Sequence, residues 1–116
     1  MTTGQEWLVD ASGCAPARLK DAAALAALFE ELVVLMDLKV VGPPQWHVFP
    51  EPGGVTGLAL LAESHLAIHT FPEHGFAALN VYCCRARARP DFDAMAAKHL
   101  GATACRVREL PRGGGA

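Results

Sequence analysis

The sequence predicts an α+β fold in which an antiparallel sheet carries helices on one face. Two observations indicate this class. Short segments typical of strands follow one another in the middle of the chain, and a loop suited to a hairpin joins two of them. Two segments with helical spacing lie outside this block, so the expected order of elements is β-α-β-β-β-β-α-β. Strands joined by hairpins are antiparallel, and helices then gather on one side of the sheet.

The first half of the chain supplies one strand and the longer helix. Residues 6–11 form the expected first strand, and Pro16 suits a helix start, where its missing N–H costs nothing. A helical pattern covers residues 18–39 and ends before residues 42–44, Gly-Pro-Pro. The apolar positions that repeat with helical spacing are Leu25, Leu28, Phe29, Leu32, Leu35 and Met36.

Four expected strands follow, over residues 45–49, 55–61, 66–71 and 76–85. Residues 72–75, Pro-Glu-His-Gly, form the hairpin loop between the last two of these strands. Asp91 can cap a second helix that runs to about residue 99 and ends at Gly101. Residues 104–110 form the last strand, and residues 112–116 a mobile tail. Residues 1–116 therefore form a single domain.

The composition excludes several classes of protein. Apolar residues make up 52% of the chain and charged residues 19%, which is too few for a disordered protein. The net charge of −2 argues against nucleic-acid binding. We expect no membrane association, because no apolar run approaches a membrane span and no signal peptide is visible. The four cysteines form no C-x-x-C pair, so we expect a cytoplasmic protein with reduced thiols.

The hairpin loop also predicts a register. If Phe71 faces Phe76, then His65 lies opposite Tyr82 and Glu63 opposite Cys84. Because strand faces alternate, one face collects aliphatic side chains and the other collects polar and aromatic ones. The expected core face contains Leu66, Ile68, Leu79 and Val81, and the expected polar face contains His65, His69, Phe71, Phe76, Asn80, Tyr82 and Cys84.

The segment Glu63-Ser64-His65-Leu66-Ala67-Ile68-His69-Thr70 concentrates reactive side chains. A serine hydroxyl can attack the carbonyl of the preceding residue and convert the peptide bond into an ester. Loss of the serine α-proton then expels the carboxylate, and the serine becomes a pyruvoyl group. This chemistry needs a donor for the oxyanion and a base, and Ser64, Thr56 and His69 are candidates for these roles. Alternation places the side chain of Ser64 on the face of the sheet opposite to that of His69. If the two side chains cooperate, the chain must leave strand geometry at Ser64, so we expect a turn or bulge there.

A longer motif resembles a known family. Glu63-Ser64-His65-x-x-x-His69-Thr70-x-Pro72-Glu73-x-Gly75-x-Ala77-Ala78, followed by Cys84, is similar to the small prokaryotic class of S-adenosylmethionine decarboxylase proenzymes. Residues 7–10, Trp-Leu-Val-Asp, and residues 55–57, Val-Thr-Gly, extend the similarity over most of residues 5–110. The resemblance implies a two-layer α/β sandwich that dimerises, with active sites near the dimer interface.

The resemblance also implies self-cleavage of the Glu63–Ser64 bond. Residues 1–63 would become a β chain and residues 64–116 an α chain with an N-terminal pyruvoyl group. Ser64 matches the pyruvoyl precursor, His69 the processing base, and Cys84 the proton donor during turnover. Thr56 falls where the family usually has a serine that assists processing.

The same resemblance implies the reaction. The substrate amine forms a Schiff base with the pyruvoyl carbonyl, which takes up the electrons as CO₂ leaves, so neither PLP nor a metal is expected. The product from S-adenosylmethionine is the aminopropyl donor of spermidine synthesis. We expect the substrate to contact Phe49, Phe71, Glu73 and His65, with the two phenylalanines suited to stack on adenine and Glu73 to bind ribose hydroxyls.

Some positions depart from the family pattern and leave two alternatives open. Asn80 stands where an Asp is common, which weakens an argument for cation binding, and Phe71 and His74 replace a frequent Trp and Tyr. The first alternative keeps the pyruvoyl chemistry but acts on ornithine or arginine. The second is a non-catalytic or metal-binding relative in which processing has been lost, with His65, His69 and Cys84 as the candidate metal ligands.

Other noteworthy residues have ordinary structural interpretations. We expect Cys14, Cys83 and Cys105 to be small buried residues. Trp46 and Phe49 occur more often in a core than against a ligand. The alternating arginines Arg85, Arg87 and Arg89 are expected on a solvated strand edge.

Overall fold

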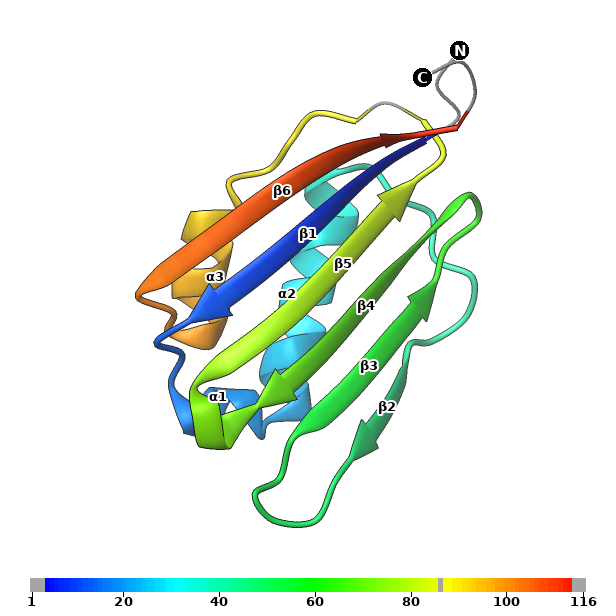
Figure 1. The fold of residues 1–116 in the computed structure, drawn as a ribbon. Coiled ribbons are helices and arrows are strands. Elements are labelled where there is room, and N and C mark those ends of the chain that lie inside the picture. Colours follow the sequence, from blue (N-terminus) through cyan, green and yellow to red (C-terminus); the bar gives the residue numbers. More distant parts are fainter. Residues whose placement is uncertain (1–3, 86, 114–116) are drawn as a thin grey trace.

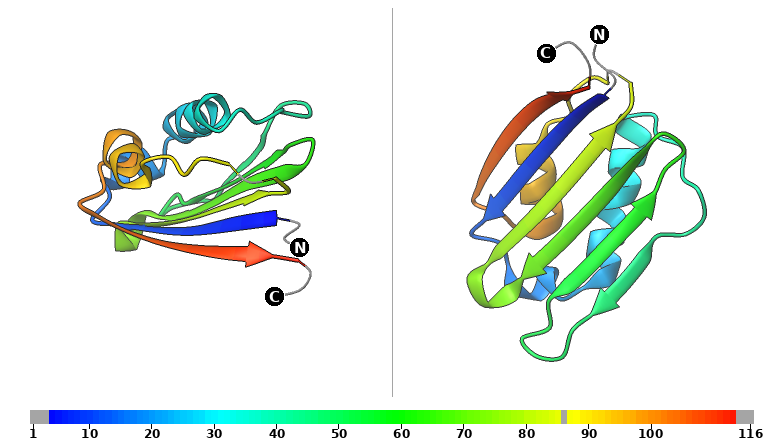
Figure 2. Two further views of the ribbon diagram at one scale, coloured as in Figure 1. Left: turned by 90° about the horizontal axis from the view of Figure 1, so that it is seen from above. Right: turned by 45° about the vertical axis from the view of Figure 1, so that its right-hand side comes forward.

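The computed structural model describes residues 4–85 and 87–113, and these residues form one antiparallel sheet with helices on one of its faces (Figures 1 and 2). The order of strands across the sheet is β2-β3-β4-β5-β1-β6. The elements are β1 (Gly4–Ser12), α1 (Pro16–Leu19), α2 (Ala22–Leu35), β2 (Gln45–Val48), β3 (Val55–Leu60), β4 (Ser64–Phe71), the 3₁₀ turn η1 (Pro72–His74), β5 (Phe76–Cys83), α3 (Phe92–Leu100) and β6 (Ala104–Arg112). The expected α+β sandwich is confirmed. Within the described part of the chain, no helix has the length and apolar character needed to cross a membrane.

The helix expected over residues 18–39 is two helices in the structure. α1 ends at Leu19, and Asp21 adopts an extended conformation with φ −101° and ψ 101° before α2 begins. The Asp21 carboxylate accepts a hydrogen bond of 2.9 Å from the backbone N–H of Ala23. A carboxylate at this N-cap position satisfies a donor that the first turn leaves free. Asp21 therefore starts a helix instead of lying along one.

The end of α2 also differs from the expectation. Asp37 has φ 52°, in the left-handed region, and the N–H of Leu38 donates to the carbonyl of Val33 at 2.9 Å. This pattern closes the helix at Leu35, before residue 39 is reached. Leu35 is 55% exposed. The other members of the expected stripe are buried, namely Leu25, Leu28, Phe29, Leu32 and Met36.

The second half of the chain follows the predictions except after β5. The Asp91 carboxylate accepts from the N–H of Ala94 at 3.0 Å, and Gly101 ends α3 with φ 67°. β5 stops at Cys83, so the described arginines of the Arg85–Arg89 run lie in the connection to α3 and not on a strand edge. β6 extends to Arg112, which pairs with Gly4, and residues 114–116 of the expected tail lie outside the described residues.

The register predicted from the hairpin loop is confirmed. Phe71 lies opposite Phe76 and His65 opposite Tyr82. The expected core face is buried against the helices through Leu66, Ile68, Leu79 and Val81. Polar side chains therefore lie on the face of the sheet that faces away from the helices.

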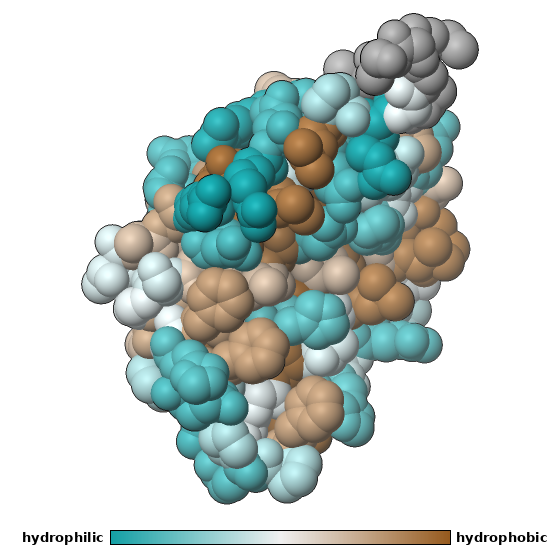
Figure 3. All heavy atoms as spheres, in the orientation of Figure 1, coloured by the Kyte–Doolittle hydropathy of each residue, from teal (hydrophilic) through white to brown (hydrophobic). Residues whose placement is uncertain are grey.

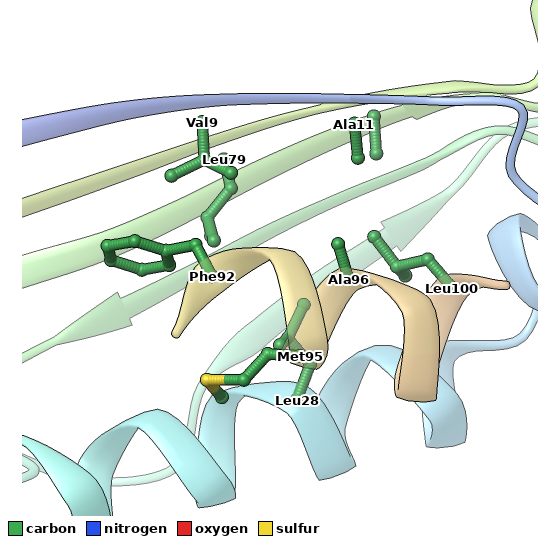
Figure 4. Close-up of a pocket in the computed structure, with 9 residues that line it drawn as sticks. Val9, Ala11, Leu28, Leu79, Phe92, Met95, Ala96 and Leu100 are labelled. Atoms are coloured by element: carbon green, nitrogen blue, oxygen red, sulfur yellow. The ribbon is translucent and has the colours of Figure 1, made fainter. Parts of the chain in front are cut away.

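The core between the sheet and the helices is closely packed. Figure 4 shows Val9 and Leu79 of the sheet above Phe92 and Met95 of α3 and Leu28 of α2. The cavity among these apolar side chains has a volume of about 10 Å³, roughly the space of one water molecule. It has no room for a ligand, so the functional site must lie elsewhere.

The other face of the sheet is not covered by any described element (Figure 2). Thr56, Leu58 and Leu60 of β3 point to this face, because the residues between them are buried. Leu58 is 48% exposed and Leu60 is 61% exposed. Apolar and polar side chains are interleaved across the face (Figure 3).

Candidate active site

A tight turn precedes Ser64. The N–H of Leu61 donates to the carbonyl of Ser64 at 3.1 Å, which leaves Ala62 and Glu63 as the two residues of the turn between β3 and β4. The Glu63–Ser64 peptide bond therefore lies where this turn enters β4, next to the end of β5 (Figure 1). The turn ends before Ser64, which pairs regularly with Cys83 in β4. The departure from strand geometry that we expected at Ser64 itself is therefore not seen.

Two groups from the residues that directly follow β5 contact Glu63. The backbone N–H of Cys84 donates to the Glu63 carbonyl oxygen at 3.1 Å, as the predicted register requires. The Arg85 Nε donates to the Glu63 carboxylate at 2.7 Å. A backbone N–H directed at a carbonyl oxygen is the type of donor that stabilises an oxyanion when the carbonyl carbon is attacked.

The two adjacent thiols differ in accessibility. Cys83 is buried, and its burial raises the pKa of its thiol, with a smaller opposing effect from the charge of Arg87. Cys84 is exposed beside the turn. Because only Cys84 can meet a ligand without rearrangement, it is the reactive candidate of the pair.

A second group of expected site residues lies at the far end of β3 and β4. The Thr56 hydroxyl lies 3.1 Å from Nδ1 of His69, directly across the two strands. A cleft of about 430 Å³ opens beside this pair. The cleft is lined by Phe49, Pro50, Pro52, Gly54, Thr56, His69, Thr70, Phe71 and Glu73.

Three of the four residues expected to contact substrate therefore share this cleft with Thr56 and His69. Phe49 is 49% exposed and Phe71 is 40% exposed, so part of each side chain is accessible to a ligand. The preference for a core position applies to Trp46, which packs on Phe29 with ring centroids 5.0 Å apart, and not to Phe49.

The two groups are well separated within one chain. Ser64 and His69 occupy the two ends of β4, five residues apart and on opposite faces of the sheet. With a rise of about 3.3 Å per residue, their Cα atoms are roughly 16 Å apart. The structure thus places Ser64 beside Cys84 and His69 beside Thr56, and it does not bring the two pairs together.

His65, the fourth expected substrate contact, belongs to a polar network on the open face. Its Nε2 lies 2.8 Å from Oδ1 of Asn80, and Nδ2 of Asn80 donates to Glu6 at 2.7 Å. Because the Asn80 amide donates to Glu6, its oxygen faces His65, and Nε2 of His65 must carry the proton. Arg112 donates to the other Glu6 oxygen at 2.5 Å.

Glu6 was not among the predicted site residues. The available signal was the alternation of the first strand, which places Glu6 on the face opposite to Trp7. The hydrogen bond from Asn80 lowers the pKa of Glu6, burial opposes this effect, and Arg112 adds to the lowering. The Glu6 carboxylate thus lies next to Asn80, which carries no carboxylate of its own. The positive charge of Arg112 balances the negative charge of Glu6.

The metal-binding alternative finds no support in the described residues. Within residues 4–85 and 87–113, no three side chains of the types that ligate metals are grouped closely enough to hold an ion. His65 and His69 are four residues apart on an extended strand, or about 13 Å.

Comparison with known proteins shows the family. A family model described as S-adenosylmethionine decarboxylase matches residues 5–113. The chain belongs to the S-adenosylmethionine decarboxylase family. It is 36% identical over 115 residues to the S-adenosylmethionine decarboxylase proenzyme 2 of Halalkalibacterium halodurans, covering 98% of this chain and 89% of that protein. It is 37% identical over 90 residues to the S-adenosylmethionine decarboxylase proenzyme of Pyrococcus abyssi, covering 78% of this chain and 63% of that protein.

A solved structure supports the same family and fold. The crystal structure of the adenosylmethionine decarboxylase from Aquifex aeolicus VF5 matches with a TM-score of 0.76 and 29% identity. The match covers 97% of this chain and 92% of that chain. In this member of the S-adenosylmethionine decarboxylase family, the candidate site therefore consists of two groups at opposite ends of β4.

Proposed function

We propose that the chain is a self-processing, pyruvoyl-dependent S-adenosylmethionine decarboxylase that cleaves its own Glu63–Ser64 bond. The observation that carries this proposal is the hydrogen bond from the Cys84 N–H to the Glu63 carbonyl, at a tight turn directly before a serine. A carbonyl held by a donor, with a hydroxyl on the next residue, meets the first requirement of the cleavage. Family membership supports the same reaction.

In the proposed cleavage, the Ser64 hydroxyl oxygen attacks the Glu63 carbonyl carbon while a base takes the hydroxyl proton. The C–N bond breaks and an ester forms. Removal of the Ser64 α-proton expels the Glu63 carboxylate and leaves dehydroalanine. Hydrolysis then releases ammonia and leaves a pyruvoyl group on residues 64–116. We assign His69 as the processing base, with Thr56 orienting its imidazole, since their side chains are 3.1 Å apart.

The separation of Ser64 from His69 supports a homodimer. Two copies can pack with their open sheet faces against each other. If the two-fold axis between them is perpendicular to β4 and parallel to the sheets, β4 of one copy runs in the opposite direction to β4 of the other. This arrangement would place Thr56 and His69 of one copy over the turn at Glu63–Ser64 of the other, where the Ser64 side chain must turn from the helix-facing side toward the open face. The uncovered face, with exposed Leu58 and Leu60, supplies an apolar surface for this contact.

During turnover, a pyruvoyl group supplies the carbonyl that binds the substrate amine and withdraws electrons as CO₂ leaves. We assign the exposed Cys84 thiol as the donor of the proton to the substrate carbon. The cleft between Phe49 and Phe71 favours a substrate with a planar ring, and the Glu73 carboxylate can accept hydrogen bonds from ribose hydroxyls. These features favour S-adenosylmethionine over ornithine or arginine, which have no aromatic ring.

A CO₂-release assay with S-adenosylmethionine, ornithine and arginine tests the proposed activity. Release from S-adenosylmethionine alone, abolished in Ser64→Ala, is the expected result. Phenylhydrazine should modify the wild-type protein and leave Ser64→Ala unmodified, because only the former would carry a reactive carbonyl. Release from ornithine or arginine alone would contradict the substrate assignment. Release of CO₂ from none of the three by correctly folded protein would contradict the activity.

A further inference from the structure

Directly after β5, the cationic side chain of Arg85 lies against Glu63, the residue whose peptide bond is proposed to be cleaved. The Arg85 Nε donates to the Glu63 carboxylate at 2.7 Å, immediately after the residue whose N–H donates to the Glu63 carbonyl at 3.1 Å. Glu63 is thus held at both its side chain and its backbone by consecutive residues. Both partners are 22 or fewer residues away in sequence, and the hairpins of the sheet bring them together.

The ion pair has little value for the stability of the fold. The Arg85 side chain is 65% exposed and that of Glu63 is 49% exposed. Exposed ion pairs contribute little to folding free energy, because water already solvates both charges. Its position is therefore better explained by the chemistry of the adjacent peptide bond.

The cleavage creates negative charge at the residue that already carries one. The attack of Ser64 places an oxyanion on the Glu63 carbonyl, and the elimination leaves the same carbon as a carboxylate. The Glu63 side chain is itself a carboxylate, so both steps bring two negative charges onto one residue. Repulsion of this kind raises the barrier unless a cation offsets the first charge.

Resting on the self-cleavage proposed above, we propose that Arg85 is a positioning residue for that cleavage, which holds Glu63 in the turn and neutralises its side chain as the oxyanion forms. Arg85 touches neither the hydroxyl nor the carbonyl that react. It acts through Glu63, and it complements the direct hydrogen bond from the Cys84 backbone.

The test is the rate at which newly made precursor is cleaved in a cell-free translation reaction, followed by gel electrophoresis. We expect Arg85→Ala to slow cleavage by about tenfold, within the range that one unit charge a few ångströms away gives near a protein surface. Arg85→Lys should cleave within about twofold of the wild type, because it keeps the charge. Arg89→Ala is the matched control, since it removes an exposed arginine from the same connection, and it should cleave at the wild-type rate.

Two further measurements separate a charge effect from a folding defect. Raising the ionic strength should narrow the difference in cleavage rate between the wild type and Arg85→Ala, because salt screens both the ion pair of the wild type and the repulsion left in the variant. Glu63→Gln should reduce the effect of Arg85→Ala, because no side-chain charge then needs to be offset. Equal cleavage rates in wild type and Arg85→Ala, or equal slowing of both by salt, would overturn the role of Arg85. A wild-type chain that is never cleaved would instead overturn the self-cleavage itself.

Discussion

The hydroxyl of Thr56 lies 3.1 Å from Nδ1 of His69, across the two strands β3 and β4. This contact fixes the imidazole at one end of the open sheet face and leaves Nε2 available to a reacting group. We expect Thr56→Val to slow processing by about tenfold, the value of one lost hydrogen bond, and Thr56→Ser to retain most of the rate. Fragment formation over time measures both. A Thr56→Val rate equal to that of Thr56→Ser would contradict the role of the hydroxyl.

The separation of Ser64 from His69 makes a prediction about mixed dimers. Neither Ser64→Ala nor His69→Ala should be cleaved when expressed alone. In a mixed dimer, the His69→Ala copy supplies Ser64 and the other copy supplies His69, which restores one complete site. Co-expression of the two variants, each with a different affinity tag, should therefore yield fragments of the His69→Ala chain only. If that chain stays intact in purified mixed dimers, the shared site is wrong.

Cys84 has one role that its side chain supplies and one that its backbone supplies. Cys84→Ala removes the thiol but keeps the N–H that donates to Glu63. We expect this variant to be cleaved at the normal rate and to lose about 10²-fold to 10⁴-fold in kcat, the range for loss of a proton donor. Steady-state CO₂ release measures the turnover, and fragment analysis measures the cleavage. A folded Cys84→Ala chain that is not cleaved would place the thiol in processing instead.

The Glu6 network predicts a dependence of stability on acid. Interactions with Asn80 and Arg112 lower the pKa of Glu6 below its ordinary value of 4.5 in the folded protein. The resulting stabilisation is fully present above pH 4.5 and is lost as the pH falls through the lowered pKa. Urea unfolding between pH 5 and about pH 3 should show a steeper loss of unfolding free energy in the wild type than in Glu6→Gln. Identical pH profiles for the two proteins would contradict a contribution of Glu6 to the loss of stability in acid.

Gly57 predicts a stability effect close to the cleft. A Cβ added to Gly57 would lie 2.1 Å from the ring of Trp46, which packs on Phe29. We expect Gly57→Ala to lower the unfolding free energy by about 1–3 kcal/mol, the usual cost of overpacking, because Trp46 must move. Chemical denaturation measures this change. Val34→Ala is the control, since Val34 is 78% exposed on α2, away from the sheet face proposed for the dimer contact, and should cost much less.

The sequence determined the local pairings well and the long-range ones poorly. The loop of residues 72–75 fixed the register of β4 and β5, and alternation then assigned Leu66 and His65 to opposite faces. The position of Cys84 beside Glu63 followed directly. These features depend on residues that are close in sequence, where turn geometry leaves few choices.

Other features depend on choices that the sequence pattern does not resolve. β1 lies between β5 and β6, so Glu6 meets Asn80 and Arg112 only because of this strand order. The break between α1 and α2 depends on Asp21 acting as a cap, whereas the periodicity alone allowed one continuous helix. The distance between Ser64 and His69 was available from the rise of a strand, but the motif grouped them because they are near in sequence.

The intact mass of purified wild-type protein, followed over time, tests the proposed self-cleavage. Self-cleavage at Glu63–Ser64 predicts two fragments, residues 1–63 and residues 64–116, whose masses sum to that of the precursor plus one water minus one ammonia. Ordinary hydrolysis would add a whole water without loss of ammonia. A folded wild-type chain that keeps its full-length mass on prolonged incubation, or fragments with the masses of simple hydrolysis, would contradict the formation of a pyruvoyl group from Ser64.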